Sequence, residues 1–231
     1  MPDRRIIAIG GGELKNRETL KIDEYIANEA KKMAGERRAC GLFLPTASHD
    51  CMPYYNTFHK VYTGIFGIKT DVALTVGREV DLEKLRLKFE KADFIYVGGG
   101  DTVFMLEHWK KIGLLPLIRE AYERGVLLCG LSAGAICWFE DMYTDSLVEG
   151  EYAMYPALGW LTGKISPHYN ERMLDFDEIV LYNRFRAWGI ENDAALEFVN
   201  EQPVRTVSGG GKVWILDGFD GATVKKAEFK N

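Results

Sequence analysis

The sequence predicts an α/β protein with a doubly wound, mainly parallel sheet and helices on both faces. Short apolar runs typical of buried strands alternate with segments in which apolar residues recur at helical spacing. Such alternation is typical of βαβ units, in which a crossover helix follows each strand. The 231 residues contain no repeat, low-complexity tract or linker, so we expect a single domain over 1–231.

The part of the chain up to residue 129 supplies most of this alternation. Strands are expected at 5–9, 40–44, 68–76, 94–97 and 126–129, and helices at 19–34, 54–66, 82–89, 102–109 and 114–124. In 19–34, for example, apolar residues at 22, 25, 26, 30 and 33 form one stripe. Pro45 ends the second strand, and Asp101 or Thr102 can cap the helix after the fourth strand.

The pattern changes after Phe139. Residues 141–155 are polar and rich in turn formers, and 164–169 form a short extended segment, because a residue before proline avoids the helical conformation. A helix is expected over 171–186 and a strand pair over 187–199, turning around 191–193. Strands at 204–207 and 213–216 complete the prediction as a C-terminal β-hairpin.

Composition and charge exclude several classes of function. The net charge is only −5 and no basic stripe is visible, which argues against a nucleic-acid partner. No apolar run approaches the length of a membrane span, and the N-terminus lacks the apolar core of a signal peptide. The four cysteines contain no Cys-x-x-Cys pair, so we expect reduced thiols in a cytoplasmic protein.

No cofactor or metal is expected. The four histidines are scattered without the spacing of metal ligands. The glycines at 10–12 follow the first strand but do not make a dinucleotide fingerprint, because Lys15 stands where that pattern needs glycine. We expect these glycines to serve a close approach of backbone to a neighbouring loop, with a ligand as the alternative.

The most informative segment is Gly130-Leu131-Ser132-Ala133-Gly134, between an apolar strand and the start of a helix. Gly-x-Ser-x-Gly in this context is the pattern of a nucleophile elbow, in which a strained turn presents a serine hydroxyl above the sheet. The small residues prevent collision between the strand and the helix. The alternative is that this turn serves packing alone.

A second glycine loop, at 98–100, ends the fourth expected strand. In an open α/β sheet, ligands bind beyond the carboxyl ends of the strands, so both glycine turns are expected at the same edge. If the two strands are neighbours, the N–H of Gly99 or Gly100 lies near Ser132. Together with the N–H of Ala133, it would form an oxyanion hole.

A serine nucleophile needs a base within hydrogen-bond reach, and the base needs a group that holds its tautomer. Of the histidines, His168 is the best placed, because it follows the proline-stiffened segment at 164–167. A structural role for this histidine is the alternative. Asp145 and Glu191 are the candidate acids, and the residue pattern does not choose between them.

Three segments together resemble a known family. Val97-Gly98-Gly99-Gly100-Asp101-Thr102, Gly130-Leu131-Ser132-Ala133-Gly134-Ala135 and Ser166-Pro167-His168-Tyr169, in this order, are similar to the peptidase E / cyanophycinase family of serine peptidases. The resemblance implies a fold related to class I glutamine amidotransferases, with serine in place of the nucleophilic cysteine. It also implies Ser132 as nucleophile and His168 as base, with an oxyanion hole from the glycine loop and Ala133.

For the acid, the resemblance favours Asp145, since peptidase E has an aspartate shortly after the elbow; Glu191 is the second choice. The family often has Asn where this chain has Asp101. This chain has no match to the residues by which peptidase E selects an N-terminal aspartate. We therefore expect a dipeptidase-like serine peptidase that acts on small peptides through an acyl-enzyme, as a monomer or homodimer. The alternatives are an esterase or amidase with the same triad and a non-catalytic small-molecule binding module.

Overall fold

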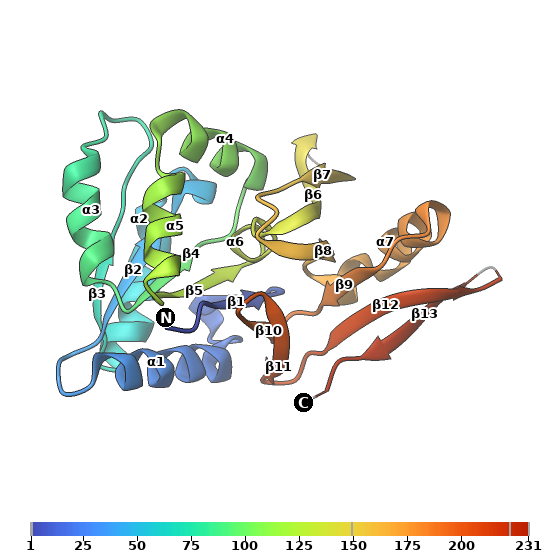
Figure 1. The fold of residues 1–231 in the computed structure, drawn as a ribbon, viewed down its shortest axis with the longest axis horizontal. Helices are drawn as coiled ribbons and strands as arrows, with labels where there is room; N and C mark the ends of the chain where they lie inside the picture. The colour runs from blue at the N-terminus through green and yellow to red at the C-terminus, as the bar shows by residue number, and fades with distance from the viewer. Residues whose placement is uncertain (1, 149, 222, 231) are drawn as a thin grey trace.

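A computed structural model describes residues 2–148, 150–221 and 223–230, and it contains a seven-stranded and a six-stranded sheet (Figure 1). The strands are β1 (Arg5–Ile9), β2 (Cys40–Leu44), β3 (Lys69–Val72), β4 (Phe94–Val97), β5 (Leu127–Leu131), β6 (Phe139–Val148), β7 (Glu151–Pro156), β8 (Leu161–Ser166), β9 (Ala187–Ile190), β10 (Ala194–Val199), β11 (Gln202–Ser208), β12 (Val213–Asp220) and β13 (Thr223–Glu228). The α-helices are α1 (Leu20–Ala34), α2 (Met52–His59), α3 (Leu82–Lys91), α4 (Thr102–Ile112), α5 (Leu115–Glu123), α6 (Ala133–Ile136) and α7 (Tyr169–Asn183).

The seven-stranded sheet has the order β11-β10-β1-β5-β4-β2-β3. From β1 to β3 neighbouring strands are parallel, as expected from the alternation of strands and helices, whereas β10 and β11 add an antiparallel edge. In Figure 1, α1 covers one face of this sheet, and α3 and α5 cover the other. The α/β class with a mainly parallel, doubly wound sheet is therefore confirmed.

The apolar strand residues point alternately into two clusters, one on each face of this sheet. One cluster contains Ile6, Leu42, Ile95 and Leu128, packed with residues of α3, α4 and α5. The other contains their strand neighbours, such as Ile7 and Phe43, packed with residues of α1 and α2. Because both faces are covered, the strands are apolar along their whole length. These continuous apolar runs are the feature from which the sequence predicts the strands.

The six-stranded sheet, of order β13-β12-β9-β8-β6-β7, was not expected. The polar segment 141–155, interpreted as turn-rich, lies mostly in the antiparallel pair β6 and β7. The predicted hairpin of 204–207 with 213–216 is wrong, because β11 pairs with β10 in one sheet and β12 pairs with β9 in the other. The chain ends instead in the hairpin of β12 and β13.

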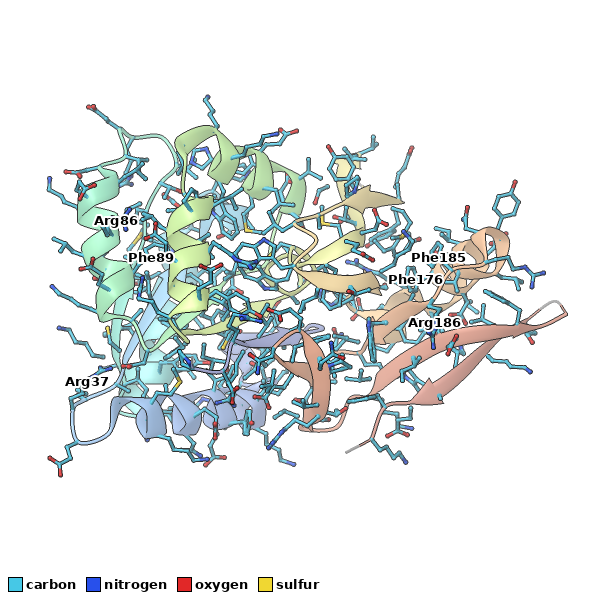
Figure 2. The ribbon with its side chains drawn as sticks, viewed as in Figure 1. Arg37, Arg86, Phe89, Phe176, Phe185 and Arg186 are labelled. Carbon is cyan, nitrogen blue, oxygen red and sulfur yellow. The ribbon has the colours of Figure 1, made fainter. Side chains whose placement is uncertain are left out.

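The chain crosses between the two sheets twice near its C-terminal end. β9 and β10 are strands, as expected, but they do not pair with one another: β9 belongs to the six-stranded sheet and β10 to the seven-stranded one. A third apolar cluster lies between α7 and the six-stranded sheet, where Phe176 and Phe185 lie close together (Figure 2). No helix in the described part of the chain is both long and apolar enough to cross a membrane.

Candidate active site

Ser132 occupies a strained turn between β5 and α6. Its backbone has a φ of 51° and a ψ of −109°, a conformation that a non-glycine residue rarely adopts. The turn needs small neighbours, as expected: a β-carbon at Gly130 would lie 1.9 Å from the carbonyl oxygen of Gly134. One at Gly134 would lie 2.2 Å from the carbonyl oxygen of Val97. The local geometry is thus strand, tight turn and helix, with a half-buried serine at the turn.

The structure brings His168 to this serine. Nε2 of His168 lies 2.9 Å from Oγ of Ser132, a hydrogen-bond distance. The two residues come from different sheets, because Ser132 follows β5 and His168 stands between β8 and α7. The junction of the two sheets therefore assembles the pair.

Two glycines of the run 10–12, Gly10 and Gly11, contact His168. The His168 N–H donates to the Gly10 carbonyl oxygen at 3.0 Å, and His168 has a φ of 49°. A β-carbon at Gly11 would lie 2.3 Å from Nδ1 of His168. Gly10 and Gly11 therefore make the expected close approach to neighbouring loops: Gly10 to the Ile190 and Glu191 carbonyl oxygens, and Gly11 to the side chains of His168 and Asn192.

Asn192 lies on the other side of the imidazole, with its Oδ1 2.6 Å from Nδ1 of His168. The sequence predicts Asp145 or Glu191 for this position, and within the described residues neither carboxylate is hydrogen-bonded to the imidazole. Glu191 instead accepts hydrogen bonds from the Lys212 N–H and from Nε1 of Trp214. Asp145 acts on His168 only through its charge.

The glycine loop after β4 stands beside the serine. β4 and β5 are neighbouring parallel strands, which meets the condition set for an oxyanion hole, and a β-carbon at Gly99 would lie 3.5 Å from Cβ of Ser132. The Gly99 N–H donates to the hydroxyl of Tyr54 at 3.2 Å. No described acceptor bonds the N–H groups of Gly100 and Ala133, so these two donors remain free for an anion.

Asp101 has a structural task at the end of this loop. Its Oδ1 accepts a hydrogen bond from the Phe104 N–H at 2.9 Å, which caps α4 as the sequence predicts. Gly100, which precedes it, has a φ of 139°, and a β-carbon there would lie 2.2 Å from the Ala47 carbonyl oxygen. The loop is therefore held by contacts that leave room for glycine alone at position 100.

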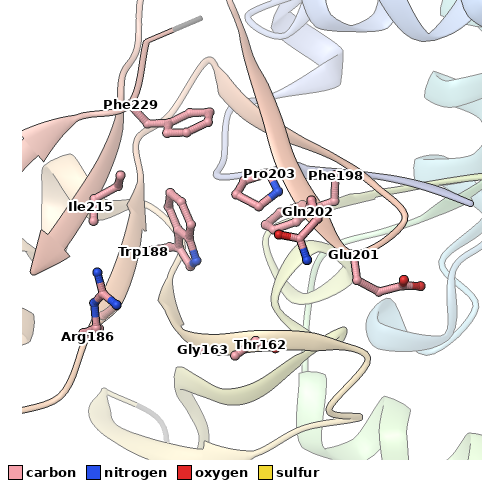
Figure 3. A pocket seen from close by; sticks show the side chains of 11 residues that line it. Thr162, Gly163, Arg186, Trp188, Phe198, Glu201, Gln202, Pro203, Ile215 and Phe229 are labelled. Atoms are coloured by element: carbon pink, nitrogen blue, oxygen red, sulfur yellow. The ribbon is translucent and has the colours of Figure 1, made fainter.

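A cavity of about 330 Å³ opens over Ser132 and His168. Residues 12–14, Tyr54, Gly99, Gly100 and Leu131 line it together with this pair. Glu13, whose side chain is exposed, supplies a carboxylate at its rim. A larger cavity of about 520 Å³ lies between β9, β12 and the β10–β11 edge, among Trp188, Phe198 and Phe229 (Figure 3). It contains none of the predicted site residues.

The electrostatics of the site favour a neutral imidazole. Burial lowers the pKa of His168 below its ordinary value of 6.5, and the nearby Arg172 guanidinium lowers it further. The hydrogen bond to Asn192 and the charges of Glu171 and Asp145 act in the opposite direction and are outweighed. Within 2–148, 150–221 and 223–230, no group of three or more His, Cys, Asp or Glu side chains is arranged to hold a metal ion.

Sequence reasoning missed Asn192 and Tyr54. Asn192 stands in the run Glu191-Asn192-Asp193, which is typical of an ordinary polar turn. Tyr54 belongs to an aromatic stripe on 54–66, a pattern typical of core residues, and its neighbours in the stripe do pack in the core. In neither case does the local pattern signal a contact with the histidine or the glycine loop.

A family model and two relatives of known sequence all relate this chain to peptidases. The model of Peptidase family S51 matches residues 6–206. An uncharacterized peptidase of Bacillus subtilis, YgaJ, is 37% identical over 211 residues, which cover 89% of this chain and 87% of the relative. Peptidase E of Shewanella oneidensis is 28% identical over 181 residues, covering 75% of this chain and 69% of the relative.

Two solved structures share the fold. A crystal structure of a peptidase from an acI-B1 Actinobacterium superposes with a TM-score of 0.73 at 18% identity, covering 97% of this chain and 94% of the other. A putative peptidase E protein from Listeria monocytogenes gives a TM-score of 0.68 at 20% identity, covering 90% and 100%. These similarities confirm the fold and the family expected from the three sequence motifs.

Proposed function

This chain belongs to peptidase family S51 and is a serine peptidase, and we propose that it hydrolyses dipeptides and other short peptides with Ser132 as the nucleophile. The observation that carries the proposal is the 2.9 Å distance between Oγ of Ser132 and Nε2 of His168. A serine hydroxyl is a weak nucleophile until a base at this distance accepts its proton.

The proposed reaction proceeds through an acyl-enzyme. His168 accepts the proton of Ser132 as Oγ attacks the peptide carbonyl carbon, and the resulting imidazolium then gives that proton to the leaving amine as the C–N bond breaks. Water, deprotonated by the same histidine, attacks the acyl-enzyme, and Ser132 recovers its proton as the acid departs. A neutral imidazole at the start of the cycle agrees with the lowered pKa of His168.

The N–H groups of Gly100 and Ala133 are proposed to hold the negative oxygen of the tetrahedral intermediate. Gly99, named with them from the sequence, lies beside Ser132, but its N–H is already engaged by Tyr54. Gly99 would then shape the hole, and its N–H would join only if Tyr54 turns away. Loss of one such donor typically costs about 10²–10³-fold in turnover.

The size of the cavity supports small substrates. At about 330 Å³ it lies near the lower end of the range of small-molecule pockets, roughly 300–1,000 Å³. Such a volume fits a dipeptide better than a segment of a folded protein. The Glu13 carboxylate at the rim suits the free ammonium group of a short peptide, so we propose that it contributes to substrate binding.

Incubation with a library of dipeptides, followed by mass spectrometry of the products, tests the proposal. The parent enzyme should hydrolyse a subset of the library, and Ser132→Ala should lower turnover by about a millionfold without loss of the fold. Simple esters provide the comparison for the alternative, because an esterase would hydrolyse esters and leave every dipeptide intact. Hydrolysis of dipeptides at the parent rate by Ser132→Ala would overturn the mechanism.

A further inference from the structure

The hydrogen bonds of the site continue beyond the histidine. Nδ1 of His168 contacts Oδ1 of Asn192, and Nδ2 of Asn192 donates to Oε1 of Glu171. Glu171 lies in the first turn of α7, directly after His168, and its own N–H donates to the His168 carbonyl oxygen at 2.8 Å. Serine, imidazole, amide and carboxylate thus form one continuous chain of contacts, in which no carboxylate touches the imidazole.

The direction of the hydrogen bonds in this chain follows from its last member. An ionised carboxylate accepts hydrogen bonds and donates none, so the Asn192 atom beside Glu171 must be the NH₂ group. The amide oxygen then faces the imidazole, and it can only accept. Nδ1 of His168 must therefore carry the proton, and Nε2 keeps the lone pair that the Ser132 hydroxyl requires.

The opposite orientation of the amide would disable the site. With Asn192 turned over, its NH₂ group would face Nδ1 and favour the tautomer protonated at Nε2. That tautomer cannot accept the proton of Ser132. Glu171 prevents this, since a turned amide would place the Asn192 oxygen against the Glu171 carboxylate, and two acceptors repel.

We propose that Asn192 is the positioning residue that holds His168 in the Nδ1–H tautomer, and that Glu171 fixes the orientation of the Asn192 amide. This inference rests on the proposed function of Ser132 and His168. It assigns to a neutral amide the position for which the sequence predicts Asp145 or Glu191. Asn192 is held in place independently of these side-chain contacts, because its N–H donates to Oδ1 of Asn170 at 2.8 Å and its backbone forms a bridge with Gly11.

The charges around the imidazole make this arrangement testable by pH. Arg172 faces His168 from α7, as does Glu171, and Asp145 acts on it from β6. The double substitution Asn192→Asp with Glu171→Gln exchanges the amide and the carboxylate while the total charge stays the same. An Asp at 192 would accept from Nδ1–H and also from the new Gln amide, so every hydrogen bond keeps a donor and an acceptor.

The first experiment needs no substrate. Two-bond ¹H–¹⁵N NMR of the histidine side chains distinguishes the two neutral tautomers, and the signal of His168 is identified by its loss in His168→Gln. At a pH above the pKa of His168, the parent protein should show Nδ1 protonated and Nε2 unprotonated. Glu171→Ala should yield a mixture of tautomers, whereas Glu178→Ala on the same helix should leave the parent pattern. The Nε2–H tautomer in the parent would overturn the proposal, whether or not the protein hydrolyses any peptide.

The second experiment follows turnover on the peptide that the parent hydrolyses best. Asn192→Ala should lower kcat by about 10²–10⁴-fold with a small change in KM, the range of a positioned general base. Asn192→Asp alone should also lose activity, because it sets two carboxylates together, and adding Glu171→Gln should restore most of that loss.

In the double variant the carboxylate stands next to the imidazole and favours its charged form. The acid limb of the pH profile should therefore move upward by about one pH unit or more. A purely structural role for Asn192 predicts neither the restoration nor this shift. Full activity of Asn192→Ala together with a large loss in Asp145→Asn or Glu191→Gln would return the role to a carboxylate.

Discussion

Gly11 lies directly against the imidazole of His168: a β-carbon at position 11 would stand 2.3 Å from Nδ1 of the ring and 2.0 Å from Oδ1 of Asn192. Gly11→Ala should therefore displace the His168–Asn192 pair and lower kcat by about a hundredfold or more, since overpacking of this kind moves side chains. We expect an accompanying loss of about 1–3 kcal/mol in the free energy of unfolding. Turnover and urea denaturation measure the two effects.

Gly64→Ala provides the matched control for this substitution. No atom lies within 4 Å of a β-carbon placed at Gly64, which is in the helical segment Lys60–Ile65. It should keep the turnover of the parent and should not lower the unfolding free energy; a gain of up to about 1 kcal/mol is expected, because alanine favours a helix more than glycine does. Equal behaviour of the two alanine variants would show that the close approach at Gly11 has no role in the site.

The pH profile should follow the lowered pKa of His168. Only the neutral imidazole accepts the serine proton, so kcat/KM should fall at acid pH with an apparent pKa below the ordinary value of 6.5. Arg172→Gln removes a cation that disfavours the imidazolium, and this should move the acid limb to higher pH. An acid limb above pH 7 in the parent enzyme would contradict the burial of the ring as the main cause.

The carboxylate of Glu13 should favour substrates with a free N-terminus. Glu13→Gln should raise KM for such peptides by about two- to fivefold, the size of one exposed ion pair, and leave KM for N-acetylated peptides unchanged. Glu24→Gln, on the exposed surface of α1, is the control. An equal rise in KM for both kinds of peptide would remove Glu13 from ammonium binding.

Asp23 should make the stability of the fold depend on pH. Burial raises the pKa of this carboxyl to about 7, against the ordinary value of 3.8, while hydrogen bonds from Thr19 and Tyr62 lower it only in part. The folded state then binds the proton more tightly than the unfolded state. Its contribution is complete below pH 4 and is lost as the pH rises to about 7, by roughly 1.4 kcal/mol per pH unit in between.

Asp23→Asn removes this titration. Relative to the parent, the variant should gain unfolding free energy as the pH is raised from 5 to 8, as measured by urea denaturation at each pH. Asp217, which lies on β12 with its side chain about half exposed, is the control through Asp217→Asn. A constant difference between Asp23→Asn and the parent across this range would mean that the buried carboxyl is ionised throughout.

The seven-stranded sheet is largely predictable from the sequence, whereas the six-stranded sheet is not. β1, β2, β4 and β5 are buried on both faces, so each is a continuous apolar run that local pattern detects. β6 and β7 are partly exposed and polar, and such strands are set by their partners more than by their own residues. The wrong hairpin of 204–207 with 213–216 has the same cause: the residues of β11 and β12 do not indicate which of the two sheets each strand joins.

The candidate site divides in the same way. The tight turn at Ser132 requires small neighbours, and the glycines that meet this requirement can be recognised in the sequence. His168 follows a proline, which restricts the backbone conformation of the segment before it. Asn192 lies between β9 and β10, where the chain passes from one sheet to the other, and it contacts the imidazole of His168 from 24 positions further along the chain. The sequence does point to this turn through Glu191, the residue before Asn192, but only the assembled fold shows that the Asn192 amide and not the Glu191 carboxylate reaches the ring.

The most direct measurement for the whole account is active-site labelling of Ser132 with a fluorophosphonate, followed by peptide mass spectrometry. The parent enzyme should take up one equivalent of the label, on Ser132, and His168→Gln should react far more slowly because its serine keeps its proton. Ser132→Ala should take up none, and Ser146→Ala, which removes a different hydroxyl, should react as the parent does. Absence of label in the parent enzyme, or the same uptake by Ser132→Ala, would contradict the proposal that this hydroxyl is the nucleophile.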